Sequence, residues 1–311
     1  MTMKVQFPDE IISLQDEDEY VNLMIYADSG VGKTVFAGSD DDVLFIAPED
    51  NGTLSAKRFG STAMKWKIHT WADIQDAYNW LREQDPIPFN WVVLDSLTEM
   101  QQMCMRHILD QGVELNPGRD PDVPQLQDWV PYYEKFRRLV KSFNALPCNV
   151  LYTALQMEDE NEEGDKVVIP MLQGKGTQYA KATASWMTSF GNMRVVRRRT
   201  GTDEDGHAVY EEYRVIQWRG SKTVMAKDRT RCLEPKTVIR EGHIGNLKEL
   251  RELLEAGPQQ PAPGRVVPNK RNRRSNRNGE KESNPMSLVK ATQDSVDEAA
   301  DMVGIEEETD A

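Results

Sequence analysis

"LMIYADSGVGKTVFAG", residues 23–38, decides the fold of this chain. Four apolar residues run directly into a short glycine-containing loop that ends in Gly-Lys-Thr. A buried strand, a glycine-rich loop and a helix in this order form a cradle for a nucleotide triphosphate, because loop N–H groups and the helix N-terminus point at the phosphates. The stretch therefore predicts a nucleotide-binding α/β fold.

Residues 27–34 match the phosphate-loop consensus, with alanine at the first glycine position. Within this loop, Lys33 is expected to bridge the terminal phosphates of ATP, and the Thr34 hydroxyl is expected to bind Mg²⁺. The predicted nucleotide-binding residues of the loop are Ala27, Asp28, Ser29, Gly30, Val31, Gly32, Lys33 and Thr34.

A second element of such a site is an apolar strand that ends in aspartate, and "WVVLDS" (91–96) supplies Asp95. We expect Asp95 to hold the Mg²⁺ together with Thr34. The alternative is that Asp95 only caps the helix that follows. The pairing with a phosphate loop favours the metal site.

The general base is not obvious from the motif, because Ser96 stands where AAA+ hydrolases usually place a glutamate after this aspartate. "VLFIAPEDN" (43–51) offers Glu49 at the end of the strand beside the phosphate loop. Glu49 is therefore the predicted base that polarises the attacking water. Asp50 is its close competitor, and either carboxylate could be a solvated turn residue.

Apolar segments alternate with amphipathic ones up to residue 156. This alternation predicts a mainly parallel sheet covered by helices on both faces, a P-loop α/β core. After residue 156 the pattern changes to short strands and hairpins, and a last helix over 247–256 closes the core. The predicted strands are 21–26, 42–50, 89–97 and 148–156, and the predicted helices before residue 156 are 71–84 and 131–146.

Composition divides the chain into a core, 1–255, and a predicted disordered tail, 256–311. The tail carries six basic residues and no acid over 265–278, and it is acidic over 294–311. The net charge of −13 does not exclude a local basic groove for nucleic acid. With three scattered cysteines and no apolar run of 18 residues, we expect free thiols and a cytoplasmic protein.

The phosphate loop, Glu49, "VVLDS" and a strand that ends in Gln156 together resemble the RecA/RadA recombinase core over residues 20–235. The layout is most similar to phage-encoded RecA-like proteins of recombination and single-strand annealing. The resemblance implies a Mg²⁺-dependent, DNA-stimulated ATPase that binds single-stranded DNA and forms a homo-oligomeric ring or filament. It implies that Gln156 senses the γ-phosphate. It also implies that Lys227 and Arg229, predicted as alternate residues on one face of a late strand, reach the γ-phosphate of a neighbouring subunit.

The same resemblance places two DNA-binding loops on the sequence. The mobile one corresponds to 157–185, which starts very acidic and has its cations at Lys166, Lys175 and Lys181, so a loop that binds nothing is a rival interpretation. The first loop corresponds to 110–128. A further basic candidate is the run Arg194, Arg197, Arg198 and Arg199. The tail is expected to recruit DNA through its basic stretch and to compete with DNA, or to bind a single-strand-binding protein, through its acidic end.

Three other functions compete with this interpretation. An AAA+ loader or remodelling ATPase needs a helical lid after Gln156, where the sequence shows strands. A non-catalytic module would use ATP only as a structural ligand of a DNA-binding protein. A small-molecule kinase would show neither DNA stimulation nor oligomerisation.

Overall fold

The computed structural model describes residues 20–48, 52–161, 163–174, 176–203, 205–240 and 242–258. The chain divides into two compact units. The first unit comprises 1–195 and 213–258, and the second comprises 196–212 and 259–311. The predicted tail lies outside the described residues from residue 259 onward. No helix in the described ranges is long and apolar enough to cross a membrane.

In the described part of the chain one sheet of ten strands dominates, and its order is β10-β8-β7-β1-β5-β4-β2-β3, with β6 beside β5 and β9 beside β7. The strands from β7 through β3 in this order are parallel, whereas β6, β9 and β10 pair antiparallel with their neighbours. Their bounds are β1 (Asn22–Ala27), β2 (Val43–Ala47), β3 (Met64–Lys67), β4 (Trp91–Leu94), β5 (Asn149–Glu160), β6 (Lys166–Pro170), β7 (Ser189–Thr202), β8 (Ala208–Gln217), β9 (Lys227–Asp228) and β10 (Lys236–Ile239). The predicted mainly parallel α/β core is confirmed.

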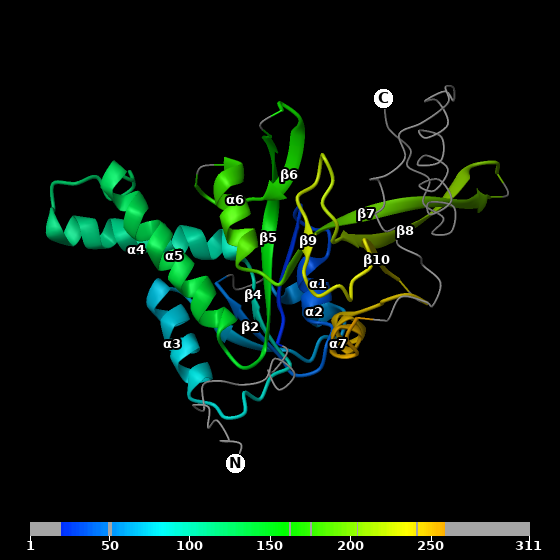
Figure 1. Ribbon diagram of the computed structural model, residues 1–311, viewed down its shortest axis with the longest axis horizontal. Coiled ribbons are helices and arrows are strands. Elements are labelled where there is room, and N and C mark those ends of the chain that lie inside the picture. The colour runs from blue at the N-terminus through cyan, green and yellow to red at the C-terminus, as the bar shows by residue number, and fades with distance from the viewer. Residues whose placement is uncertain are drawn as a thin grey trace, which may run out of the picture. The chain divides into compact units, whose positions relative to one another are not determined.

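Helices cover both faces of the sheet (Figure 1). Helices α3, α4 and α5 pack on one face, and α1 and α7 pack on the other. The helices are α1 (Lys33–Ala37), α2 (Leu54–Arg58), α3 (Trp71–Arg82), α4 (Leu97–Leu115), α5 (Trp129–Asn144), α6 (Gly176–Ser185) and α7 (Leu247–Glu255), with a 3-10 turn η1 (Leu126–Asp128) before α5.

Strand β1 shows why the sheet needs two helical layers. Met24 and Tyr26 point into the α3–α4–α5 layer, while Leu23 and Ile25 point into the α1–α7 layer, and all four side chains are fully buried. Successive residues of a strand face opposite sides, so an uninterrupted apolar strand must be covered twice. The phosphate loop therefore starts from a strand whose residues 23–27 are fully buried.

Helix α7 is fixed to this core by a buried ion pair. Arg251 donates to both carboxylate oxygens of Asp40, at 2.7 and 3.2 Å, and the indole N–H of Trp91 donates to the same carboxylate at 2.9 Å. The side chain of Asp40 is completely buried. A buried carboxylate is tolerated only when it is paired and hydrogen-bonded in this way, so α7 belongs to the first unit.

Three segments differ from the predicted elements. The segment 157–185, predicted as a mobile loop, contains the outer part of β5, its antiparallel partner β6, and α6. The segment 110–128, predicted as a DNA loop, begins inside α4, which runs to Leu115. Strand β9 is limited to Lys227–Asp228, so Arg229 follows the strand rather than belonging to it.

Candidate nucleotide-binding site

The phosphate loop leaves β1 at the carboxyl end of the parallel sheet, where such folds bind nucleotides. Gly30 and Gly32 have φ values of 80° and 112°, in a region that favours glycine, and Gly32 is the residue before α1. Side chains at these two positions would strain the loop. Ala27, at the consensus glycine position, is the buried last residue of β1.

Lys33 is held by the loop itself. Its ammonium donates to the backbone carbonyls of Ala27 at 2.9 Å and Asp28 at 2.8 Å. Burial lowers the pKa of Lys33, and the nearby carboxylates of Asp95 and Asp28 partly oppose that shift. The Lys33 side chain therefore folds back over the loop. A phosphate bound there would accept hydrogen bonds from the Lys33 ammonium.

The two predicted Mg²⁺ ligands are adjacent. The Thr34 hydroxyl donates to Oδ2 of Asp95 at 2.7 Å, and the buried Thr153 hydroxyl of β5 donates to Oδ1. Ser96 accepts from the Glu99 N–H and caps α4, so Asp95 is not the cap. A hydroxyl and a carboxylate fit Mg²⁺, which takes few protein oxygens and completes its shell with phosphates and water. Among the described residues, no group of three His, Cys, Asp or Glu forms a metal site.

Gln156 connects the phosphate loop to two strands. Its amide nitrogen donates to Oδ2 of Asp28 at 2.8 Å, and its amide oxygen accepts from Asn192 of β7 at 2.8 Å. Asn192 also donates to the carbonyl of Tyr26 at 3.2 Å. The predicted γ-phosphate sensor therefore touches the loop directly.

A cavity of about 550 Å³ opens over the loop, and its wall includes Lys33, Thr34, Asp95 and Arg214. Arg214 comes from β8, and its Nε donates to the carbonyl of Val31 at 3.1 Å. A Cβ at Gly32 would lie 3.5 Å from the same nitrogen. Within the described ranges, Arg214 has no carboxylate partner. The sequence analysis missed this residue, because nothing local marks an arginine in a strand as a neighbour of the loop.

A family model described as an AAA domain matches residues 19–230, about two thirds of the chain. The chain belongs to the AAA-domain family. It is a P-loop ATPase of the AAA/RecA-like type, and nucleotide binding follows from that membership. No curated protein matches the sequence.

Three solved structures are distantly similar to this AAA-domain chain. The flagellar accessory protein FlaH from Methanocaldococcus jannaschii has 10% identity and a TM-score of 0.31, over 71% of this chain and 84% of FlaH. The RadB recombinase has 10% identity and a TM-score of 0.29, over 67% and 90%. The Legionella pneumophila ATPase DotB has 11% identity and a TM-score of 0.27, over 82% and 57%.

The predicted base of the AAA domain, Glu49, and its competitor Asp50 lie outside the described residues. The cavity wall contains one further carboxylate, Glu99, which lies in the first turn of α4, four residues after Asp95. The assignment of Glu49 therefore stays a prediction, and Glu99 is the alternative acid to compare with it.

The predicted fingers differ in their surroundings. The Lys227 ammonium donates to the carbonyl of Ala184 at 2.9 Å and lies 5.7 Å from the centre of the Phe190 ring. Burial, together with repulsion from Arg229, lowers the pKa of Lys227. Arg229 is exposed, and its side chain has no partner among the residues that the structure describes. Neither residue lines the cavity over the phosphate loop of its own chain, so both stay predictions as residues that act on a neighbour.

Helix α4 joins the predicted Mg²⁺ site to the segment after β6. Three residues beyond Asp95, the Thr98 hydroxyl accepts from the Leu155 N–H and donates to the Met171 carbonyl, both at 3.1 Å. One turn later, Gln101 accepts from the Gln173 N–H at 2.8 Å. The segment 171–173 leads into α6, part of the predicted mobile DNA loop, whose Lys175 lies outside the described residues.

Of the predicted DNA-contacting cations that the structure describes, Arg194 is half-buried and the others are exposed. Lys166 lies 3.6 Å from Glu158 across the β5–β6 hairpin, and Lys181 lies on α6. In the second unit, Arg197 pairs with Glu212 at 2.7 Å, and Arg199 contacts Thr202. Arg198 points to the opposite face of β7, as strand alternation requires.

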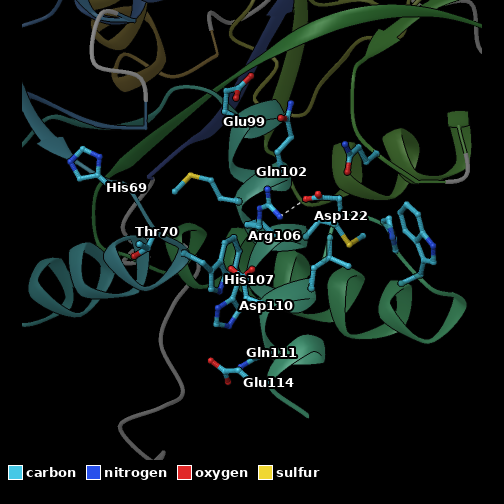
Figure 2. A pocket seen from close by; sticks show the side chains of 17 residues that line it. His69, Thr70, Glu99, Gln102, Arg106, His107, Asp110, Gln111, Glu114 and Asp122 are labelled. Atoms are coloured by element: carbon cyan, nitrogen blue, oxygen red, sulfur yellow. Dashed lines mark hydrogen bonds and ion pairs between the residues drawn. The ribbon is translucent and has the colours of Figure 1, made fainter. Parts of the chain in front are cut away.

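A second cavity, of about 920 Å³, lies along α4. Figure 2 shows that Arg106 on this helix reaches Asp122 in the loop that follows, an exposed ion pair of 2.8 Å. The wall also carries Asp110 and Glu114. This acidic cavity contains no phosphate loop and its carboxylates repel phosphates, so the smaller cavity is the candidate nucleotide site.

Proposed function

We propose that this chain is a Mg²⁺-dependent ATPase that binds single-stranded DNA, assembles as a homo-oligomer, and acts as a RecA-like recombination or annealing protein of a phage. The contact of Gln156 with the Asp28 carboxylate supports this function most directly. It joins the phosphate loop to β5 and, through Asn192, to β7. The continuations of these strands carry the predicted DNA contacts.

In this proposal the residues of the chain have separate tasks. Lys33 and the loop N–H groups bind the phosphates, Thr34 and Asp95 hold Mg²⁺, and Glu49 orients the attacking water. Arg214 adds a positive charge over the loop from the same chain. When bound, Mg²⁺ supplies charge that stabilises the transferred phosphoryl group.

A phosphate that displaces Asp28 from Gln156 changes the contacts of the Gln156 amide. Because Gln156 also holds Asn192, its movement is transmitted to β7, which carries Arg197, Arg198 and Arg199. DNA on these arginines and a nucleotide on the loop would then influence each other reciprocally, as any linked pair of ligands must.

The test is phosphate release measured with and without single-stranded DNA, for the wild type, Lys33→Ala and Gln156→Ala. We expect DNA to accelerate hydrolysis by the wild type, no hydrolysis by Lys33→Ala, and unstimulated hydrolysis by Gln156→Ala. Glu49→Gln should slow hydrolysis by roughly 10²–10⁴-fold, the usual effect of losing a general base. Glu99→Gln tests the alternative acid, and a loss of that size in Glu99→Gln but not in Glu49→Gln would assign the base to Glu99. Hydrolysis that DNA does not change, with no DNA binding at low salt, would refute the proposal.

The predicted fingers are tested by mixing two inactive variants. Arg229→Ala should bind ATP but lose DNA-stimulated hydrolysis, and Lys33→Ala protein should partly restore it, because an intact loop then meets an intact arginine from its neighbour. A mixture that assembles but stays inactive would show that Arg229 does not act between subunits.

A further inference from the structure

Helices α4 and α5 form an arm whose outer end projects from the sheet (Figure 1). We call residues 110–130 the arm tip. Large apolar side chains are exposed there, with Leu115 and Leu126 both 89% exposed and Val130 69% exposed. Leu126 and Val130 are four residues apart in consecutive helical turns, so they share one face. Leu115 and Leu126 are the most exposed large apolar side chains among the residues that the structure describes.

The arm tip is also acidic. Asp110, Glu114, Asp120 and Asp122 are exposed, and the one cation of the segment, Arg119, is buried in an ion pair with Asp128. Asp122 is paired with Arg106 from the neighbouring turn of α4 (Figure 2). Four exposed carboxylates make the tip a poor surface for DNA phosphates, which argues against the predicted first DNA loop.

A second surface of the same chain has the opposite charge. We call residues 54–67 the α2–β3 surface, where β3 is the edge strand of the sheet. This segment has four cations, Lys57, Arg58, Lys65 and Lys67, and no acid. Phe59 is 78% exposed and Met64 is 64% exposed. The α2–β3 surface is therefore apolar and basic, whereas the arm tip is apolar and acidic.

We propose that the arm tip of one molecule docks on the α2–β3 surface of a second copy of this chain. Both surfaces are exposed within a single chain, so their apolar side chains can be buried together only between copies. Charge complementarity fixes the partner and the orientation of such a contact. Because the two surfaces differ, the contact is heterologous, and its repetition produces a ring or a filament.

The contact specifies which surfaces join the copies in the homo-oligomer of the proposed function. Its functional role rests on that proposed function. Ser55 and Phe59 of the α2–β3 surface also line the nucleotide cavity. An arm tip seated there lies at the mouth of its neighbour's nucleotide site. ATP should therefore change the strength of the contact.

The experiment measures assembly of the full chain by sedimentation velocity with ATP and Mg²⁺, without DNA. The arm variant is Leu126→Asp/Val130→Asp and the surface variant is Met64→Asp/Lys67→Glu. Each should raise the concentration needed for assembly about 10-fold or more, since each removes apolar contacts and places like charges opposite one another. The control Val209→Asp changes an exposed apolar residue outside both surfaces, 42% exposed, and it should assemble like the wild type.

The decisive sample is a mixture of the two variants. Each variant keeps one intact surface, so a heterologous contact predicts dimers in the mixture and no longer assemblies. In a charge exchange, Glu114→Lys/Asp120→Lys is mixed with Arg58→Glu/Lys67→Glu, and no apolar residue is changed. Each variant alone should fail to assemble, whereas the mixture has complementary charges at both contacts and should regain assemblies longer than dimers. A monomeric wild type, variants that assemble normally, or mixtures that stay monomeric would overturn the contact.

Nucleotide and DNA binding are measured on the same variants. If Lys67→Glu weakens DNA binding and leaves assembly unchanged, the α2–β3 surface binds nucleic acid and the docking proposal is wrong. If assembly follows the prediction but no DNA binds, the contact stands and the DNA-dependent function fails.

Discussion

Replacing Arg214 with alanine tests whether a residue of β8, far from the phosphate loop in sequence, belongs to the nucleotide site. The substitution removes the hydrogen bond from Nε to the Val31 carbonyl, 3.1 Å long, and a positive charge from the cavity wall. Lys33 and Thr34 stay in place, since neither contacts Arg214.

The expected loss of ATP affinity follows from the exposure of the Arg214 guanidinium. A hydrogen bond that involves a charged group contributes about 1.5–3 kcal/mol, and the lower value applies because Arg214 is exposed. A loss of about 1.4 kcal/mol is a tenfold loss of affinity. We therefore expect Arg214→Ala to weaken ATP binding about tenfold, and Arg214→Lys to lose less, because it keeps the charge without the planar fork.

Calorimetric titration with ATP and Mg²⁺ at fixed ionic strength measures this loss. Arg219→Ala is the matched control, since Arg219 is an exposed arginine just beyond the same strand and outside the cavity wall. If Arg214→Ala binds ATP with the wild-type Kd, the charge of Arg214 over the loop does not contribute to ATP binding and the reasoning is refuted.

Three other outcomes are expected. Asp40→Ala should lower the free energy of unfolding in urea by about 3 kcal/mol or more, because it removes the buried carboxylate that accepts from Arg251 and Trp91 and leaves Arg251 only its pair with the exposed Glu255; a loss below about 1 kcal/mol would contradict this. Burial lowers the pKa of Lys33, so ATP affinity should fall with rising pH earlier than for an exposed lysine as the ammonium loses its proton, and Lys33→Ala should not show that fall. Burial raises the pKa of Cys104 and Cys148 to about 12, so iodoacetamide should alkylate Cys232 first in the native protein, and equal labelling of all three would contradict the buried environments.

Much of the fold could be predicted from local pattern. The prediction of a strand over 21–26 matches β1, and that of a helix over 71–84 matches α3 within two residues at its end. Helix α4 was not predicted, although its buried Met100, Cys104 and Ile108 recur every four residues. The polar residues between them concealed that spacing.

The candidate site could be predicted only where it is contiguous. Residues 27–34 are close in sequence, and the strand-end position of Asp95 follows from the alternation of strands and helices. Thr153 and Arg214 reach the site from β5 and β8, and their contacts depend on strand register and on which strands are neighbours. Neither the strand register nor the order of the strands can be predicted from a short stretch of sequence, because pairing between distant segments sets both.

The phosphate loop already has protein partners for the groups that a nucleotide would use. Lys33 donates to the carbonyls of Ala27 and Asp28, Thr34 donates to Asp95, and Asp28 accepts from Gln156. A triphosphate and its Mg²⁺ compete with each of these contacts, so the net affinity is the difference between the new contacts and the old ones. Two of the displaced partners also contact another strand: Asp95 accepts from Thr153 of β5, and Gln156 accepts from Asn192 of β7. Exchange at Lys33 therefore stays within the loop, and exchange at Thr34 can reach β5 through Asp95 and Thr153. Exchange at Asp28 instead changes a contact between β5 and β7, through Gln156 and Asn192.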